Sequence, residues 1–352
     1  MEEIYIIPIF VPDFKNLKKS IFYNQKAKID NKQISIEDIK KIIDTELLNV
    51  KDMDVEKEIA FLGNNFTSID VNVQKELLEL ANEYIKEQKI NSISISTTPD
   101  SIDKVILKML KKYKVKTIEL EVLSANDYIL KKSHIKYSIK DIKKASKMIK
   151  WKGFNLGYHM MVGLPESTRI DELNTAKTLI KLKPKIVRIY PAIVVKNSII
   201  EKEFEKQKYE PLPLVQAVEI CKELVRMFAD NKVETIRAEE IDTKNIFQTR
   251  TNEDIVAGPF HLEFKQLVES EMWYDSIVEK IKKLNVKVKE VEVTVNPEDV
   301  DNVIGYNKSN VIKLKETYDV DLIVKQEEEI KQGKSKIEIT KTYNDFLEDD
   351  LK

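Results

Sequence analysis

The chain has 352 residues, of which 42% are hydrophobic and 34% are charged, and its formal net charge at pH 7 is −1. This length can bury a large core and can hold one barrel of about 250 residues together with a smaller module. The composition is typical of a globular protein, so neither a single small domain nor a disordered chain is expected.

The chain contains one cysteine, Cys221, and seven glycines. One cysteine cannot form a disulfide within the chain, and it excludes a zinc or iron–sulfur site built from the chain's own thiolates. Few glycines leave few loops that can approach a phosphate or a cofactor closely. No apolar run reaches about 18 residues, and the first residues lack a basic leader. We therefore expect a cytoplasmic protein without a membrane partner.

Lysines are concentrated in residues 104–152, which carry 15 Lys against four acidic side chains and so have a local charge of +11. A local excess of this size can attract phosphate even when the whole protein is close to neutral. The lysines expected to contact nucleic acid are Lys140, Lys143, Lys144, Lys147, Lys150 and Lys152. The alternative interpretation is an ordinary solvated helix surface.

Short β-type runs alternate with longer helical periods over the first 240 residues. The predicted strands are Ile4–Val11, Glu58–Leu62, Ser92–Thr97, Thr117–Leu123, Asn155–Val162, Ile186–Tyr190 and Val233–Ala238. The predicted helices between them are Val71–Ile85, Ser101–Tyr113, Ser138–Trp151, Ile170–Leu182 and Leu214–Phe228. Repeated β-then-α units of this spacing favour an α/β fold with a parallel sheet that closes partly into a barrel. An open doubly wound sheet is the main alternative, and in both folds ligands bind at the carboxyl ends of the strands.

A smaller module is predicted after residue 285. Its order is strand (Val288–Val295), short helix, turn (Gly305-Tyr306-Asn307-Lys308), helix (Ser309–Thr317) and two further strands. We expect three parts: a barrel over 1–285, an α+β module over 286–342 and a loose acidic tail over 343–352. This order resembles a KH module, in which a G-x-x-G turn grips single-stranded nucleic acid. Lys308 replaces the second glycine, which adds a phosphate partner and removes a close backbone approach.

The loop after the first strand has the spacing of a metal-cluster loop without its ligands. Thiolates spaced C-x3-C-x2-C would hold an iron–sulfur cluster and leave one iron open. In this chain the spacing falls on Asn16, Ser20 and Tyr23. None of these side chains replaces a thiolate with comparable strength.

Several stretches together make the chain resemble the radical S-adenosylmethionine (SAM) superfamily, and within it the bacterial short relatives of the Elongator catalytic subunit. They are Ile7-Pro8-Ile9-Phe10-Val11-Pro12, Ile59-Ala60-Phe61-x-Gly63, Ile95-Ser96-Thr97-x-Pro99-Asp100, Met160-Met161-Val162-Gly163-Leu164-Pro165, Val187-Arg188-Ile189-Tyr190-Pro191 and Ala257-Gly258-Pro259-Phe260-His261. The resemblance implies a partial (β/α)6 barrel of the TIM type, a [4Fe-4S] cluster and SAM as cofactors, and tRNA modification by the longer members.

The chain departs from the family at the positions that carry the chemistry. Besides the three cluster positions, the altered SAM-site positions are Gly63, Asn64, Asn65, Thr98, Glu121, Ser124 and His159. Since the core stretches are kept, the pattern predicts a degenerate pseudoenzyme with no metal and with no cofactor expected.

Three functions stay open at this point. The first is a protein without radical chemistry that binds RNA such as tRNA, or an RNA-associated protein partner, and that does not read DNA sequence. The second is a non-radical enzyme or sensor that retains SAM or another small ligand in the barrel mouth. The third is an assembly protein that binds neither.

Overall fold

The computed structural model describes residues 4–11, 20–22, 35–63, 65–237, 254–284 and 286–343. The chain divides into two compact units, Met1–Phe260 and His261–Lys352. The boundary expected at residue 285 falls on a residue outside the described part of the chain, and the three-part division stays a prediction.

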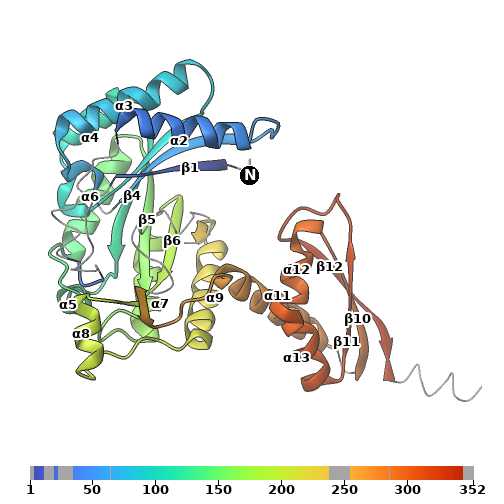
Figure 1. The fold of residues 1–352 in the computed structure, drawn as a ribbon. Helices are drawn as coiled ribbons and strands as arrows, with labels where there is room; N and C mark the ends of the chain where they lie inside the picture. The colour runs from blue at the N-terminus through green and yellow to red at the C-terminus, as the bar shows by residue number, and fades with distance from the viewer. Residues whose placement is uncertain are drawn as a thin grey trace, which may run out of the picture. The chain divides into compact units, whose positions relative to one another are not determined.

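The first unit is built on a seven-stranded sheet in which all neighbouring strands are parallel. Its strands are Ile4–Phe10 (β1), Glu56–Leu62 (β2), Ser92–Thr97 (β3), Val115–Leu123 (β4), Asn155–Val162 (β5), Ile186–Pro191 (β6) and Glu234–Arg237 (β8). Their order in the sheet follows their order in the sequence, without the reversal that defines a doubly wound fold. The predicted α/β fold with a partial barrel is confirmed (Figure 1).

Helices connect these strands, as parallel neighbours require. They are Ile36–Asn49 (α2), Val71–Lys86 (α3), Lys104–Lys112 (α4), Asp127–Lys132 (α5), Ile139–Trp151 (α6), Arg169–Lys181 (α7), Ile199–Glu205 (α8) and Leu214–Asp230 (α9). Capping boxes begin α6 at Ser138 and α7 at Thr168, because each hydroxyl accepts from the third helical N–H while an aspartate accepts from the cap. Val194–Val195 (β7) and Ile255–Ala257 (β9) form a separate antiparallel pair.

The second unit combines helices with a three-stranded sheet of order β11-β10-β12. Its elements are Phe264–Lys282 (α11), Val288–Val295 (β10), Val300–Ile304 (α12), Ser309–Tyr318 (α13), Asp321–Gln326 (β11) and Ser335–Thr342 (β12). Strand β10 is parallel to β11 and antiparallel to β12. Alternate residues Val291, Val293 and Val295 are fully buried and pack with Val303 and Leu314 of the two helices that follow. The order of elements is the predicted one.

Asn310 ties the turn between α12 and α13 to helix α11. Its side chain is fully buried, and its Nδ2 donates to the carbonyls of Ser270 (2.8 Å), Val303 (3.1 Å) and Asn302 (3.4 Å). A Cβ on Gly305 would lie 2.8 Å from the Asn310 nitrogen, so the turn can approach this closely only with glycine there.

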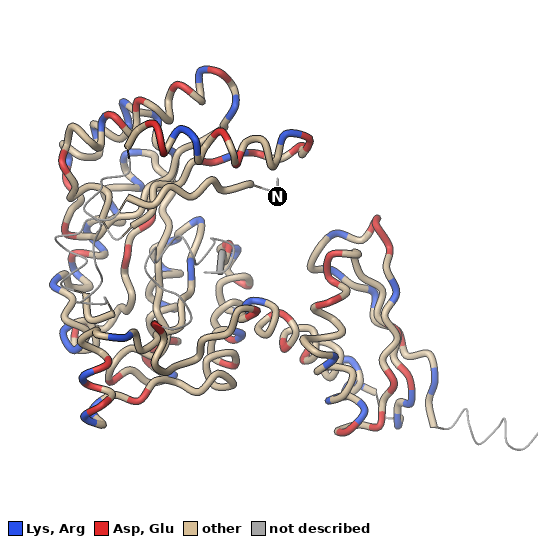
Figure 2. The backbone as a smooth tube through the Cα atoms, viewed as in Figure 1, with Lys and Arg blue, Asp and Glu red and all other residues tan. Residues whose placement is uncertain are grey.

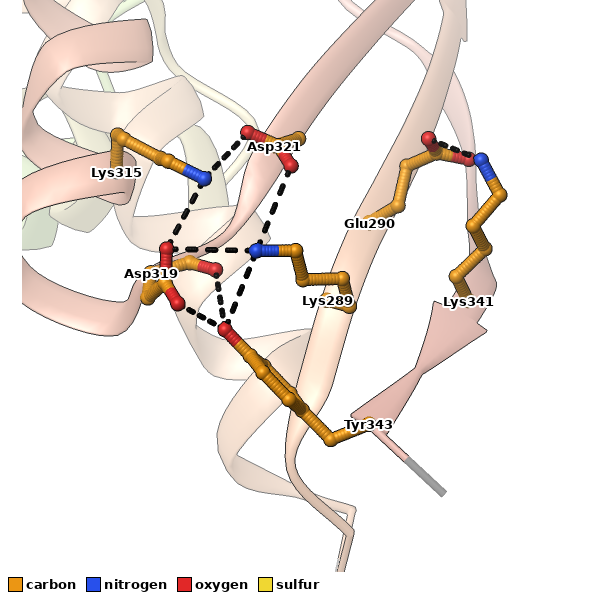
Figure 3. A network of polar contacts seen from close by, with 7 residues as sticks. All are labelled: Lys289, Glu290, Lys315, Asp319, Asp321, Lys341 and Tyr343. Atoms are coloured by element: carbon orange, nitrogen blue, oxygen red, sulfur yellow. Dashed lines mark hydrogen bonds and ion pairs between the residues drawn. The ribbon is translucent and has the colours of Figure 1, made fainter. Parts of the chain in front are cut away.

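Figure 3 shows a polar network of the second unit, where α13 ends, β11 begins and β12 ends. Lys315 pairs with Asp319 (3.0 Å) and Asp321 (2.8 Å), and the hydroxyl of Tyr343 donates to Asp319. Exposed ion pairs of this kind stabilise a fold by at most about 1 kcal/mol each. The network anchors the chain as far as Tyr343; residues 344–352 of the expected acidic tail lie outside the described part. Among the described helices, none combines the length and the apolar character that crossing a membrane would need.

Candidate functional site

Polar side chains gather on one face of strands β2 to β6, at positions that alternate with buried apolar residues. The hydroxyl of Tyr158 on β5 lies 2.6 Å from that of Ser146 on α6, so Tyr158 faces the helices. His159, the next residue, therefore points to the opposite, inner face of the sheet. The polar residues of this face, on neighbouring strands, are Glu58, Ser92, Ser94, Thr117, Glu119, Glu121, His159 and Arg188. The barrel thus has an apolar outer and a polar inner face.

The centre of the inner face is an ion pair between Glu119 of β4 and Arg188 of β6. Arg188 donates through Nε to Oε2 (2.6 Å) and through Nη2 to Oε1 (2.9 Å), and both side chains are almost completely buried. Such a two-point contact fixes the orientation of both groups. The remaining nitrogen, Nη1 of Arg188, has no hydrogen-bond partner among the described residues.

Gly157 on the intervening strand β5 makes room for this pair. A Cβ at Gly157 would lie 2.7 Å from Cγ of Glu119 and 2.7 Å from Cγ2 of Ile186, distances that real Cβ atoms do not show. Glycine is therefore required at this position because Glu119 must cross β5 to reach Arg188 on the next strand.

The pKa values of the two carboxyl groups of β4 are shifted in opposite directions. Burial by itself would raise the pKa of Glu119, but the charge of Arg188 and hydrogen bonds from His159 and Arg188 hold that pKa well below its usual range. Glu121, two residues on, has no such partner among the described residues. Burial, followed by the charge of Asp100, raises the pKa of Glu121 to about 7. One strand thus presents a fixed anion beside a carboxyl group that changes charge near neutral pH.

At the carboxyl ends of β2 and β3, the predicted SAM-site positions Asn65 and Thr98 meet each other. Asn65 Nδ2 donates to the hydroxyls of Thr98 (2.7 Å) and Ser101 (2.7 Å), and its Oδ1 accepts from Thr97 (2.8 Å). Gly63 precedes them with φ +114°, a conformation that favours glycine. Both ends of the Asn65 amide are therefore used within the protein.

The other predicted site positions are scattered. Ser124 lies against α7, 3.4 Å from the hydroxyl of Thr175, away from the Asn65 cluster. Ser20 accepts a local hydrogen bond from the Phe22 N–H (3.3 Å). Asn16, Tyr23 and Asn64 lie outside the described residues.

The predicted nucleic-acid lysines share helix α6 and its end. Lys140, Lys143, Lys144 and Lys147 are exposed and make no ion pair among the described residues. Figure 2 marks Lys and Arg in blue and Asp and Glu in red along the backbone. Lys150 donates to the carbonyl of Leu182 (3.0 Å), and Lys152 lies 4.6 Å from the ring centre of Trp151.

In the second unit, the predicted positions Gly305 and Lys308 are the first and last residues of the turn between α12 and α13. Lys308 is exposed and has φ +62°, in the left-handed region that the second glycine of a G-x-x-G turn would occupy at lower cost. Tyr306 of the turn packs edge-on against His261, with ring centres 5.0 Å apart.

The ion pair itself was not singled out from the sequence, although a signal for it exists. Glu119, His159 and Arg188 each place a polar group in a strand that also carries buried apolar residues, and such groups are expensive to bury unless they are paired.

Two family models match the chain in succession. The Radical SAM superfamily matches residues 22–179, and the Radical_SAM C-terminal domain matches residues 184–274. A tRNA uridine(34) acetyltransferase of Methanocaldococcus infernus is 25% identical over 183 residues, which are 46% of this chain and 34% of that protein. An uncharacterized protein of Methanocaldococcus jannaschii is 29% identical over 158 residues, which are 44% of this chain and 48% of that protein. The chain thus spans a third to a half of these curated relatives.

The fold is also similar to a solved structure. The archaeal Methanocaldococcus infernus Elp3 with an N-terminal deletion superposes with a TM-score of 0.59 at 18% identity, covering 80% of this chain and 64% of that one. At this identity the similarity concerns the fold alone.

The expectation that no cofactor belongs to this chain is wrong. The matching superfamily is named for SAM, so SAM, and with it the [4Fe-4S] cluster that the resemblance implies, are the cofactors that family membership assigns. The donor set nevertheless does not suit a cluster held by three thiolates, because the chain has one cysteine, Cys221, buried on α9. A cluster in this chain would need other ligands. With the two family models covering residues 22–179 and 184–274, the chain is an Elongator-related member of the radical SAM superfamily.

Proposed function

We propose that this chain is a degenerate member of its superfamily that binds RNA, with tRNA the expected RNA, and that does not cleave SAM reductively. The observation that carries the proposal is the row of exposed lysines on α6, which make no ion pair within the described residues. The curated relatives named tRNA uridine(34) acetyltransferase support tRNA as the first RNA to test.

The acidic residues near these lysines are outnumbered, four against 15 over residues 104–152. Glu119 is buried against Arg188, Asp141 caps the start of α6 through Ser138, and Asp127 accepts from the Ile139 N–H (2.7 Å). Asp141 offsets part of the charge of Lys140 and Lys144, and the remaining lysine excess is presented to solvent. Such a surface suits a phosphate backbone.

An aromatic ring accompanies the lysines. The side chain of Trp151 at the end of α6 is 78% exposed. Proteins that bind single-stranded RNA combine a positive surface with aromatic rings on which bases stack. Trp151 therefore supports a single-stranded or looped RNA as the partner.

The turn of the second unit is a weaker candidate for the main contact. Residues 261–352 carry 15 lysines and 21 acidic side chains, so this unit has a net charge of −6. Lys308 and Gly305 can add one phosphate contact in the manner of a KH turn. We expect them to contribute less than the lysines of α6.

The test is a binding measurement with tRNA at several salt concentrations. Reversing three lysines (Lys140→Glu, Lys143→Glu, Lys147→Glu) should abolish a salt-dependent complex, since each phosphate contact contributes about −0.9 to the salt slope on duplex and about −0.7 on single strands. The matched control reverses three exposed lysines at and beyond α8: Lys202→Glu, Lys206→Glu and Lys208→Glu. Equal loss in both triple variants would mean that binding reflects net charge rather than this face.

The absence of reductive chemistry is tested separately. Asn16, Ser20 and Tyr23 stand where the resemblance places three thiolates. After anaerobic reconstitution with iron and sulfide and addition of a reductant, the protein should not cleave SAM. Detected cleavage would refute this part of the proposal and leave RNA binding untouched.

A second function is favoured by the polar inner face of the barrel. A non-radical enzyme or a sensor would retain SAM or another small ligand there, and Glu121 and His159 offer polar groups to it. A rise in Tm on addition of SAM would support this second function. No rise with SAM or with nucleosides would argue against it.

A further inference from the structure

Three helices of the first unit are followed by a lysine whose backbone is left-handed. Lys114 follows the cap of α4 with φ +58°, Lys183 that of α7 with φ +54°, and Lys232 that of α9 with φ +59°. The residue after a helix cap often adopts this conformation, and it is usually glycine because a Cβ is crowded there. Gly153 has the equivalent position after α6, with φ +76°. Lysine thus stands at three helix ends at a steric cost that glycine would avoid.

These helix ends lie at the amino end of the sheet. In a β-α-β unit the helix runs back across the strands, so its last turn lies beside the start of the next strand. Lys114 directly precedes β4, and Lys183 and Lys232 lie in the loops before β6 and β8. Strands β4, β5, β6 and β8 are neighbours in the sheet. The three lysines therefore lie on the side of the sheet opposite the carboxyl ends of its strands.

Hydrogen bonds join the helix ends to the neighbouring loops. Nζ of Lys111, in the last turn of α4, donates to the carbonyl of Gly153 in the loop before β5 (3.4 Å). Nζ of Lys150, in the last turn of α6, donates to the carbonyl of Leu182 in the loop before β6 (3.0 Å). A surface that is ordered in advance loses less conformational entropy when a partner binds.

This amino-end surface is strongly positive. It is made of four segments that the structure describes, residues 111–116, 150–154, 181–185 and 230–234. They contain ten lysines and two acidic residues. Lys116 is paired with Glu56 (3.6 Å). Lys114, Lys183 and Lys232 are exposed and make no ion pair within the described residues. A lysine excess of this size attracts phosphate groups.

The apolar content of the amino-end surface favours RNA over a lipid membrane. Within its four segments, all of which the structure describes, Trp151 is the one large hydrophobic side chain that is exposed. A protein surface that binds a membrane buries a whole apolar face among the lipids. One aromatic ring among many lysines instead suits a phosphate backbone with a base stacked on the ring.

We propose that RNA binds across the amino-end surface and that Lys114, Lys183 and Lys232 contact its phosphates. This inference rests on the RNA binding proposed above and extends that contact from α6 to the helix ends beside it. Barrels of parallel strands bind their ligands at the carboxyl ends of the strands. An RNA held at the amino-end surface therefore leaves the carboxyl ends open to a second ligand.

The test removes the three charges without straining the fold. In the full chain, the triple variant Lys114→Gly, Lys183→Gly and Lys232→Gly introduces the residue that adopts a left-handed backbone without a steric cost. Thermal unfolding verifies that the variant is folded. Gln88→Gly is the control for glycine itself, because Gln88 has the equivalent position after α3, with φ +57° and no charge. The control for net charge is Lys202→Gln with Lys206→Gln and Lys208→Gln.

Binding of tRNA is measured at several salt concentrations. The triple glycine variant should reduce the slope of log K against log salt by about 2 to 3, since each lost phosphate contact contributes about 0.7–0.9. Gln88→Gly should keep the wild-type slope, and the glutamine control should change it by less than about 1.

Three results would overturn the inference. If the triple glycine variant keeps the wild-type slope while reversal of Lys140, Lys143 and Lys147 abolishes binding, this inference fails and RNA binding by α6 stands. Equal loss in the glycine variant and in the glutamine control would show an effect of net charge alone. If the wild type binds vesicles that contain phosphatidylserine and does not bind tRNA, this inference and the proposed RNA binding both fail.

Discussion

Removing Arg188 should expose the energetic role of the charged pair inside the barrel. Arg188 is fully buried, and Glu119 is 2% exposed and depends on Arg188 for two of its hydrogen bonds. In Arg188→Met the carboxylate keeps His159 as its one side-chain donor within the described ranges. Leaving a buried charge without its partner costs about 3–5 kcal/mol, so the free energy of unfolding at pH 7 should fall by that amount.

The pH dependence of this loss has a definite sign. In the wild type the pKa of Glu119 lies below its unfolded value, so its contribution to stability is present above about pH 4.5 and is lost as the pH falls. In Arg188→Met, burial instead raises that pKa above the unfolded value, and stability is lost as the pH rises. The difference between the two proteins should therefore be largest near neutral pH and should narrow towards pH 4.5.

The assay is urea unfolding followed by circular dichroism at several pH values. Hydrogen exchange of amides in β4, β5 and β6 assigns the transition to the first unit. The double variant Glu119→Met with Arg188→Met removes both charges and should regain most of the lost stability, because an apolar pair of similar volume is often as stable as a buried ion pair. A loss below about 1 kcal/mol in Arg188→Met, or no recovery in the double variant, would refute the reasoning.

Three further predictions concern separate positions. Gly157→Ala should lower stability by about 1–3 kcal/mol in thermal unfolding, since its Cβ would collide with Glu119; an unchanged Tm would contradict this. Lys308→Gly should leave the stability of the second unit unchanged or raise it by up to about 1 kcal/mol, because φ is +62° there and glycine adopts that conformation without a steric cost. The same variant should reduce the salt slope of RNA binding by about 1 if this lysine contacts a phosphate. Glu121→Gln should raise stability at pH 8 relative to wild type and change it less at pH 4.5: burial raises the folded pKa of Glu121 to about 7, above the unfolded 4.5, so wild type loses stability as the pH rises through this window. Parallel pH profiles for the two proteins would exclude Glu121 as the source.

The strands could be predicted from the sequence because their apolar runs are short, buried and separated by helical periods. All seven predicted strands begin and end within two residues of the observed strands β1 to β6 and β8. The predicted helix at Ser101 begins three residues later, at Lys104, because Asp103 caps it by accepting from the Ile106 N–H. The apolar runs and the capping residues therefore suffice to locate the strands and helices from the sequence.

The site could be predicted only in part because its geometry depends on register across strands. Glu119 and Arg188 are 69 residues apart, and they meet only because β5 between them carries Gly157. Of the predicted SAM-site positions, Asn65 and Thr98 are hydrogen-bonded to each other, whereas Ser124 lies against α7. The cofactor expectation was wrong because three missing thiolates concern one way of holding a cluster and do not decide whether SAM binds.

The buried amide of Asn310 has a mechanical consequence for the second unit. Its three bonds to backbone carbonyls join α11 and α12 at the point where the Gly305–Lys308 turn begins. A displacement of the turn would strain those bonds. Because one of them ends on Ser270, the displacement would also affect α11, a helix of 19 residues. A molecule bound at the turn would therefore act on α11 as well as on the turn itself.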